Sequence, residues 1–462
     1  MASTIVSRTQ SGAESAAGRR TWTFSCWFKR SKLGNFELFG SDSDGARNNN
    51  FFIIDFRSTD EIDMAEYISG YQLRFITNRK FRDTSAWYHL VVAFDTTQST
   101  ASDRVKIYVN GVQETSFSTA TYPSQDYQTK MFAQNKIHAF GRSGYQIDGI
   151  LSHCHATEGT AYAPTAFGET DSTTGEWKIK TDVSVSYGTN GFFLFKDDNA
   201  VTNQAGNSSG NFAVTAGTLT KTEDCPDNVF ATMATPTWYD GTIANGGNTV
   251  TTNQSNYRYQ AASLGVSSGK WYWEVKLSTA ASWGLIGITD EPSYQTGSTN
   301  ILGSETYDYA IYYGSDGSTG SGGGHLFNNA GANPGNTPGG FMGAISQGDI
   351  FTFALDLDSA TKKLYIGTNG SWSNGSNATD QTFANSTGKT ITAPSSTNTG
   401  FYFPAVGDYA GSSTSVFQFN FGNGYFGTTV VASAGTNASG IGIFEFDVPT
   451  GYTALSTKGL NL

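Results

Sequence analysis

The chain has 462 residues, enough for two or three domains. Charged residues make up only 15% of it and aromatic residues 14%, with 54 glycines, a profile typical of a β-protein with many turns. The formal net charge of -11 argues against a nucleic-acid-binding protein, because phosphate contacts need basic patches. No segment approaches the ~20 apolar residues that a membrane-spanning helix needs.

The start of the chain is small and polar. Residues 1–20 lack the apolar core of a secretory signal, so we expect synthesis in a cytoplasm and interpret this stretch as an N-terminal arm. The three cysteines, Cys26, Cys154 and Cys225, are far apart and odd in number. They allow at most one disulfide and suggest no disulfide framework.

The first predicted domain spans residues 21–196 and is a series of short strands. Its clearest feature is a hairpin, in which an apolar run at 90–94 and an alternating run at 104–109 precede Asn110-Gly111. Both turn residues tolerate a positive φ, as a tight hairpin turn requires. Further strands are predicted at 21–28, 51–56, 71–76, 137–141, 146–155 and 191–195.

Residues 197–235 change to Asp, Asn, Gly, Ser and Thr, which predicts a polar connector. A second β-domain follows at 236–430, again with an Asn-Gly turn, at Asn369-Gly370. Its predicted strands lie at 270–277, 283–288, 351–358, 363–366, 401–406 and 416–422. We expect residues 431–462 to form a tail that adds an edge strand at 443–452. The fold class predicted is all-β, with two tandem antiparallel sandwiches.

Several segments of the first domain carry a family resemblance. They include Trp22 to Arg30, Phe81 to His89 (Phe-Arg-Asp-Thr-Ser-Ala-Trp-Tyr-His), Asp103 to Gly111, and Asp148-Gly149. Together they resemble the laminin-G/concanavalin A-like jelly roll, in the form common in virion proteins of tailed phages. The resemblance covers roughly residues 15–195 and implies a lectin-like sandwich.

The second domain resembles a SPRY domain, another concanavalin-like sandwich. The motifs that carry this are Gly269 to Lys276 (Gly-Lys-Trp-Tyr-Trp-Glu-Val-Lys), Gly284 to Ile288, Leu355 to Asp358, Phe403-Pro-Ala405 and Asn420-Phe-Gly422, in the family's order. Both families imply recognition of glycans or proteins through loops or one face, although a fold alone does not set a function.

One acidic motif suggests catalysis. Glu61, Asp63 and Glu66 have the Glu-x-Asp-x-x-Glu spacing of laminarinase-like glycosidases, which share the jelly-roll fold. Retaining hydrolysis needs two carboxyl groups ~5–5.5 Å apart. On a regular strand Glu61 and Asp63 share one face and Glu66 points the other way, so a bulge would have to re-aim it. The alternative is a solvated acidic strand.

Two further patterns suggest metal sites. His153 and His155 project to one face of a predicted strand, but a third ligand such as His89 or His138 is needed for zinc or copper, so we interpret the pair as structural or surface residues. Asp42 and Asp44 resemble half of a calcium loop, but lack its remaining acids. No cofactor is predicted, and calcium is the ion such a loop would hold.

Aromatic residues in and beside the long loops of the second domain are candidates for ligand binding, because aromatic side chains offer large contact areas at low entropic cost. The alternative is that they pack onto the sandwich. The candidates are Tyr307, Tyr309, Tyr312, Tyr313, His325, Trp372 and Tyr409.

The function we predict from these features is that of a non-enzymatic virion surface protein of a tailed phage: a tail fibre, spike or capsid fibre that binds a host-surface glycan or protein. By analogy with phage fibres we expect a homotrimer that contacts other virion proteins and is assembled in the host cytoplasm. Two alternatives stay open. One is a purely structural capsid or tail component, and the other is a glycan depolymerase using Glu61, Asp63 and Glu66.

Overall fold

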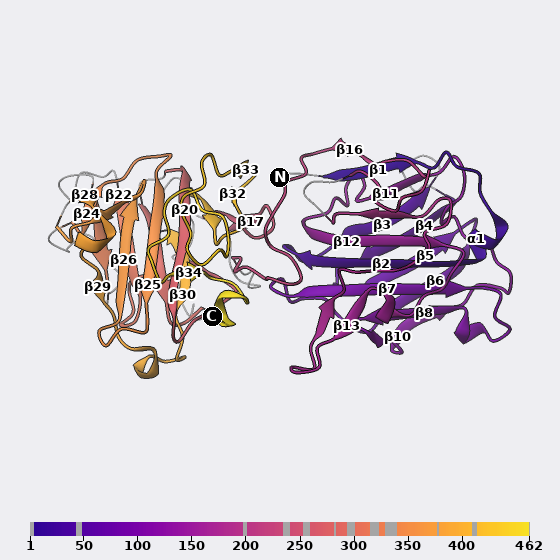
Figure 1. Cartoon of the computed structure of the whole chain (residues 1–462), viewed down its shortest axis with the longest axis horizontal. Helices are drawn as coiled ribbons and strands as arrows, with labels where there is room; N and C mark the ends of the chain where they lie inside the picture. The colour runs from indigo at the N-terminus through magenta and orange to yellow at the C-terminus, as the bar shows by residue number, and fades with distance from the viewer. Residues whose placement is uncertain are drawn as a thin grey trace. The chain divides into compact units, whose positions relative to one another are not determined.

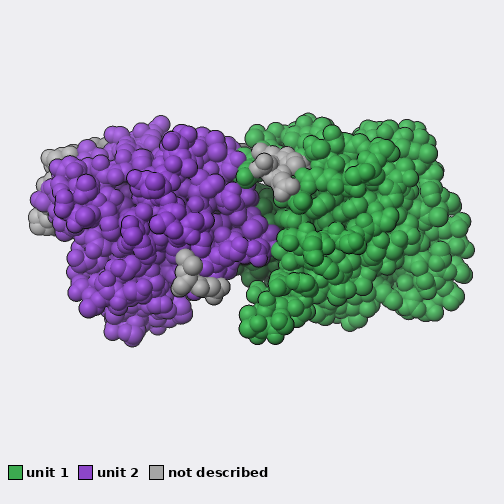
Figure 2. Space-filling view, in the orientation of Figure 1, with its two compact units in different colours: residues 1–221 green, residues 222–462 purple. Residues whose placement is uncertain are grey.

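The computed structural model describes residues 4–42, 49–196, 201–233, 241–252, 259–280, 283–292, 301–314, 323–328, 340–376, 378–408 and 414–461. The chain divides into two compact units, residues 1–221 and 222–462 (Figures 1 and 2). Nearly all of the regular structure is β-strand in antiparallel sheets, which confirms the predicted fold class. No helix within the described ranges is long and apolar enough to cross a membrane.

Unit 1 contains an eight-stranded and a six-stranded sheet. Its elements are β1 (Ile5–Thr9), α1 (Ala16–Arg20), β2 (Thr21–Arg30), β3 (Phe36–Asp42), β4 (Phe51–Phe56), β5 (Ile62–Tyr67), β6 (Tyr71–Thr77), β7 (Trp87–Asp95), β8 (Val105–Val109), β9 (Val112–Gln113), β10 (Phe117–Thr121), β11 (Ile137–Phe140), β12 (Gly149–Glu158), β13 (Gly168–Thr170), β14 (Trp177–Ile179), β15 (Phe192–Leu194) and β16 (Ala213–Ala216). The sheet orders are β10-β6-β5-β4-β3-β11-β1-β16 and β15-β12-β2-β7-β8-β9. The hairpin β13–β14 stands apart from both.

The two sheets of unit 1 bury one aromatic core between them. Alternating residues of β2, such as Trp22 and Phe24, meet alternating residues of β4, such as Phe52 and Ile54. The ring of Trp22, for example, lies edge-on to that of Phe52, with 5.5 Å between centroids. Where these strands are regular, every second side chain therefore faces inward, and the intervening side chains lie on the outer face of the sheet.

Both Asn-Gly turns are confirmed. Asn110 and Gly111 have φ values of 49° and 77°, and Asn369 and Gly370 have φ values of 52° and 80°. Positive φ at both central residues is the geometry that matches the right-handed twist of the flanking strands.

The described part of the expected arm, residues 4–20, is built into unit 1 and does not form an arm. β1 pairs with β11 on one side and β16 on the other, inside the eight-stranded sheet. Val6 joins the core, and the guanidinium of Arg8 lies 4.7 Å from the ring centroid of Phe212 and donates to the backbone oxygen of Ser209. The polar composition concealed these contacts, because each involves a partner far along the chain, at residues 137–140 or beyond residue 200.

The expected connector at 197–235 is divided between the two units, since the boundary falls between residues 221 and 222. Its isolated apolar residues explain this: Phe212 packs into the core of unit 1, whereas Phe230 and Met233 pack into the core of unit 2. Short polar segments can order in this way when single apolar side chains pack into a neighbouring core.

Unit 2 contains a ten-stranded and a six-stranded sheet. Its strands are β17 (Thr242–Ala244), β18 (Thr249–Thr251), β19 (Tyr259–Ala261), β20 (Lys270–Thr279), β21 (Trp283–Thr289), β22 (Tyr309–Gly314), β23 (Gly323–Phe327), β24 (Met342–Ala344), β25 (Ile350–Asp356), β26 (Lys363–Thr368), β27 (Ser371–Ser373), β28 (Thr379–Gln381), β29 (Lys389–Thr390), β30 (Phe403–Asp408), β31 (Val416–Asn420), β32 (Tyr425–Phe426), β33 (Thr429–Val430) and β34 (Thr453–Ala454). The ten-stranded sheet runs β17-β18-β31-β20-β25-β26-β27-β28, with β29 on β26 and β34 on β20, and the six-stranded sheet runs β19-β30-β21-β22-β23-β24.

The C-terminal segment does not add an edge strand at 443–452. Among the described residues 431–461, only β34 joins the sheet, where it pairs in parallel with Trp271 and Tyr272 of the central strand β20. Residues 443–446 instead lie across the sheet face, where the ring of Phe444 packs edge-on to Tyr272 at 4.9 Å between centroids. The backbone N–H groups of Glu445 and Phe446 each donate to the carboxylate of Glu274 at 2.8 Å, so a side chain replaces a strand partner.

Candidate functional site

The three acidic residues of the glycosidase-like motif lie on or beside β5 but do not converge. Glu61 forms an ion pair with Lys80 at 3.0 Å, and Asp63 forms one with Arg74 at 2.6 Å. Glu66 is fully buried on the inward face, where it accepts a hydrogen bond from the hydroxyl of Tyr127 at 2.8 Å. The predicted separation of Glu66 from the other two carboxyl groups is therefore what the structure shows.

The electrostatics of the motif follow from these surroundings. Burial raises the pKa of Glu66 to about 7, against opposing hydrogen bonds from Lys130 and Tyr127. Burial works against ionisation of Glu61 as well, but hydrogen bonds from Thr59 and Lys80 lower its pKa to about 2. A bulge does occur, between Glu66 and Tyr67, yet it leaves Glu66 on the core side. Glu66 therefore cannot face the same substrate as Asp63, which lies on the outer face of the strand.

The histidine pair lies at a bulge in β12. His153 has a φ of 45°, and the register of β12 against β2 shifts between Ser152 and His155. The ring of His155 is buried and stacked on Phe193 at 4.0 Å, and its Nδ1 is hydrogen-bonded to the hydroxyl of Tyr187 at 2.8 Å. Burial lowers the pKa of His155 well below its usual value. These contacts favour the structural interpretation of the pair.

Neither proposed third ligand completes a metal site. His138 belongs to the other sheet, and its Nε2 accepts the backbone N–H of Phe132 at 3.1 Å. His89 lies on β7, where the indole N–H of Trp177 donates to its Nδ1 at 2.9 Å. Because an indole only donates, Nδ1 is the acceptor, and the proton of the neutral ring sits on Nε2, which donates to the hydroxyl of Ser25 at 2.8 Å. His89 therefore cannot activate Ser25 as a nucleophile.

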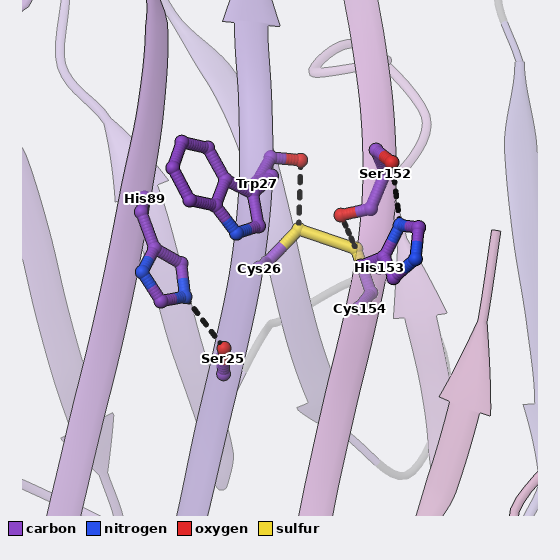
Figure 3. The surroundings of a disulfide bond; sticks show 7 residues. All are labelled: Ser25, Cys26, Trp27, His89, Ser152, His153 and Cys154. Atoms are coloured by element: carbon purple, nitrogen blue, oxygen red, sulfur yellow. Dashed lines mark hydrogen bonds between the residues drawn. A yellow bond between two sulfur atoms is a disulfide. The ribbon is translucent and has the colours of Figure 1, made fainter. Parts of the chain in front are cut away.

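The same region contains a disulfide that the sequence allowed but did not assign. Cys26 of β2 is bonded to Cys154 of β12, with 4.2 Å between the Cα atoms (Figure 3). The two sulfur atoms lie in the core of unit 1, while the rings of His89 and Trp27 stack on each other at 4.6 Å between centroids. The bond joins neighbouring strands at the bulge and is a structural feature of unit 1.

The calcium site predicted at Asp42 and Asp44 cannot be placed, because Asp44 and the side chain of Asp42 lie outside the described residues. Within the ranges that the structure describes, no three His, Cys, Asp or Glu side chains are grouped so that they could hold a metal ion.

The aromatic candidates of unit 2 are mostly buried, which corrects the ligand-binding interpretation. Tyr307 is partly buried against the core, and Tyr409 lies outside the described residues. The other five are at most 4% exposed: Tyr309, Tyr312, Tyr313, His325 and Trp372. They lie on strands rather than on open loops, so their apolar surface stabilises the sandwich and is not available to a ligand.

A different aromatic group is available on unit 1, on the outer face of the eight-stranded sheet. Tyr71 is 46% exposed, Phe51 and Tyr67 are half-buried, and the three rings form one group. Tyr67 stacks on Phe51 at 5.8 Å between centroids and meets Tyr71 edge-on at 5.2 Å. We call Phe51, Tyr67 and Tyr71 the aromatic group. Such rings, held by each other and open to solvent, suit stacking against an apolar ligand face.

Polar side chains adjoin the aromatic group on the same face. The guanidinium of Arg74 lies 4.3 Å from the ring centroid of Tyr71 and donates twice to Asp63, at 3.2 and 2.6 Å. A bidentate pair of this kind fixes the orientation of both side chains. Asp63 lies opposite Asp55 in the register, and Asp55 lies opposite Glu37, so three carboxyl groups follow one row across β5, β4 and β3.

The far end of the row repeats the same arrangement. Arg142 forms an ion pair with Glu37 at 3.1 Å, and its guanidinium lies 3.7 Å from the ring centroid of Tyr145. The row is therefore bounded at both ends by an arginine that is paired with a carboxylate and stacked on a tyrosine. We call the aromatic group, the row and these two arginine–tyrosine pairs the outer-face site.

Part of unit 1 matches a known family. Residues 7–155 match the family model described as the concanavalin A-like lectin/glucanases superfamily. This stretch includes part of β1, all of β2 to β11 and the outer-face site. It supports the predicted laminin-G/concanavalin A-like domain.

Comparison with solved structures gave distant likenesses. The SPRY domain of human HERC1 has 19% sequence identity and a TM-score of 0.26, with 39% of this chain and 91% of that chain covered. The TRIM65 PSpry domain has 12% identity and a TM-score of 0.28, covering 41% and 91%. A heptameric SAP-like pentraxin from Limulus polyphemus has 11% identity and a TM-score of 0.24, covering 35% and 79%. A search of curated proteins found no match.

The sequence contained a weak signal for the outer-face site. Tyr67 ends β5 and Tyr71 begins β6, on either side of the Ser69-Gly70 turn. Two large aromatic side chains therefore flank a turn at the end of a hairpin. Which face they occupy depends on the register shift between Glu66 and Tyr67. A one-residue shift moves a side chain to the opposite face, and no sequence pattern marks it here.

Proposed function

We propose that this protein is a non-catalytic recognition protein that binds a glycan through the outer-face site of unit 1. The observation that carries the proposal is the exposed ring of Tyr71, held beside Tyr67 and Arg74 on a sheet face that also carries carboxyl groups. Sugar rings present apolar C–H faces and hydroxyl groups, which stack on aromatic rings and donate to carboxylates.

The biological setting we propose is the surface of a tailed-phage virion, as a tail fibre, spike or capsid fibre. It is supported by the resemblance of the first domain to phage lectin-like jelly rolls and by the lectin-like family match of residues 7–155. We further propose a homotrimer by analogy with phage fibres. Repetition of a weak site within one particle would raise the overall avidity for a cell surface.

The binding proposal is tested with bacterial cells and their extracted surface polysaccharides, by measuring both retention of the protein and the size of the polymer. Retention with unchanged polymer size is expected, because Glu66 faces the core, while Asp63 and Glu61 are held in ion pairs. Shortening of the polymer would contradict the non-catalytic assignment.

The site assignment is tested with Tyr71→Ala, which removes the exposed ring from the aromatic group. We expect retention to fall by about tenfold, the effect of losing one aromatic contact of ~1.4 kcal/mol. Tyr108→Ala is the matched control, because Tyr108 is a half-buried tyrosine on β8 of the other sheet. Equal losses in the two variants would place the binding site elsewhere.

A further inference from the structure

Unit 2 is much more acidic than unit 1, and one of its sheets has few basic residues near it. Unit 1 has 21 Lys and Arg residues and 22 Asp and Glu residues, whereas unit 2 has 7 and 17. The sequence contains no lysine or arginine between Lys276 and Lys362, or between Lys389 and Lys458. These two stretches contain β21, β22, β23, β24 and β30 of the six-stranded sheet of unit 2.

Two buried carboxyl groups lie at the end of this sheet where β21 ends and β22 begins. Asp290 follows β21 directly, Asp308 directly precedes β22, and each residue is 1% exposed. Ile288 pairs with Tyr309, so the antiparallel register brings residues 289–290 beside residue 308. Burial raises the pKa of Asp308 to about 7, and the charge of Asp290 acts in the same direction. The two carboxyl groups therefore lie within electrostatic range of each other.

Neither carboxyl group has a positively charged partner among the residues that the structure describes. Oδ2 of Asp290 accepts the backbone N–H of Asn398 at 2.8 Å, and Oδ2 of Asp308 accepts that of Gly303 at 3.1 Å. Oδ1 of Asp308 is buried without a hydrogen-bond partner in the described part of the chain, and so is Oγ of Ser304 in the same loop. Because a buried carboxylate is costly to ionise without a partner, these free oxygen atoms indicate a cationic ligand.

Uncharged oxygen atoms lie near both carboxyl groups. Oγ1 of Thr289 is 3.3 Å from the hydroxyl of Tyr259, which donates to the backbone oxygen of Glu291 at 2.9 Å. Burial raises the pKa of Tyr259, as do the charges of Asp308, Glu291 and Asp290, so three carboxyl groups surround this hydroxyl. Calcium takes six to eight oxygen ligands, which include carboxylates, carbonyl oxygens and water.

We propose that this end of the six-stranded sheet of unit 2 binds a calcium ion, with Asp290 and Asp308 as its carboxylate ligands and uncharged oxygen atoms and water as the others. Such a set has only two charged ligands, which agrees with the lack of any group of three within the described ranges. The ion neutralises the buried charge and fixes the loop at 301–308 to the sheet. The inference is independent of the glycan site on unit 1.

The test compares hydrogen exchange of the full chain with and without calcium chloride, after chelation of bound metal and at constant ionic strength. Calorimetric titration of the same protein gives the Kd. We expect exchange in peptides from residues 301–314 to slow by about a hundredfold at roughly 100 times Kd, with no change in β7 of unit 1. Unchanged exchange at about 10 mM calcium, above the range of weak protein sites, would overturn the inference.

Substitutions of the two ligands test the assignment. Asp308→Asn keeps the size of the side chain and removes a ligand charge, so we expect calcium affinity to fall by at least about tenfold, and Asp290→Asn should act in the same way. Asp380→Asn is the matched control, because Asp380 is an exposed carboxylate on β28 of the same unit. Equal losses of affinity in all three variants would attribute the effect to net charge and overturn the site.

Discussion

Glu274 connects the C-terminal segment to the centre of unit 2, and its substitution should change how the stability of that unit depends on pH. The side chain is fully buried, and its two oxygens accept four hydrogen bonds. The donors are the backbone N–H groups of Glu445 and Phe446, the hydroxyl of Tyr272 at 2.9 Å and the side-chain amide of Asn420 at 3.2 Å. Four donors favour the ionised carboxylate, whereas burial favours the protonated acid.

Burial is the larger effect and raises the pKa of Glu274 from 4.5 to about 7. Between these values the folded unit keeps a proton that the unfolded chain has lost. The stabilisation linked to this proton is therefore fully present below pH 4.5 and is lost as the pH rises through about 7. A shift of this size corresponds to about 3 kcal/mol, at ~1.4 kcal/mol per pKa unit.

Glu274→Gln removes the titrating group and keeps the shape of the side chain. We expect its cost to be about 1–3 kcal/mol at low pH, because the amide nitrogen cannot accept from a backbone donor. Above pH 7 the wild-type residue has lost about 3 kcal/mol of proton-linked stabilisation, so the cost should fall to zero or become a gain for the variant.

Hydrogen exchange read by mass spectrometry measures this change unit by unit, since a chain with two units need not unfold in one step. Opening free energies of peptides from β20 and from residues 443–448 are compared between the wild type and the variant, after correction for intrinsic exchange rates. Peptides from β7 of unit 1 serve as the internal control. A difference between the two proteins that stays constant from pH 4.5 to above pH 7 would refute the reasoning.

Three further outcomes are expected. Cys26→Ser removes the disulfide to Cys154, which closes a loop of 128 residues. In urea unfolding the variant should destabilise unit 1 by about 2–5 kcal/mol and leave unit 2 unchanged. Equal stability of the wild type with and without reductant would contradict this. Trp177→Phe leaves the buried Nδ1 of His89 without its hydrogen-bond donor, so unit 1 should lose about 1–3 kcal/mol of stability while glycan binding stays unchanged. A loss of glycan binding would implicate the six-stranded sheet in recognition. Glu61→Gln should leave polysaccharide size unchanged in gel filtration, and a change relative to wild type would reveal catalysis.

Local patterns in the sequence predicted the strands well. The alternation at Thr21 to Phe28 became β2, and both Asn-Gly turns formed as expected, because these features depend only on neighbouring residues. The separation of Glu66 from Asp63 was also predictable, since it follows from the two-residue period of a strand.

Long-range packing was not predictable from these patterns. Tyr312 and Trp372 resemble exposed recognition residues in sequence, but Phe327 covers the first and Phe383 the second. The position of Tyr71 depends on a register shift that no motif marks. Each outcome is decided by contacts between distant segments rather than by local propensity.

The most direct test of the central claim is a hydrogen-exchange map of the full chain with and without a bound polysaccharide. The proposed site predicts protection confined to peptides from Phe51–Phe56, Ile62–Tyr67 and Tyr71–Thr77, which carry the aromatic group and most of the carboxylate row. Protection confined to unit 2, with these three strands unchanged, would contradict the assignment of recognition to the eight-stranded sheet.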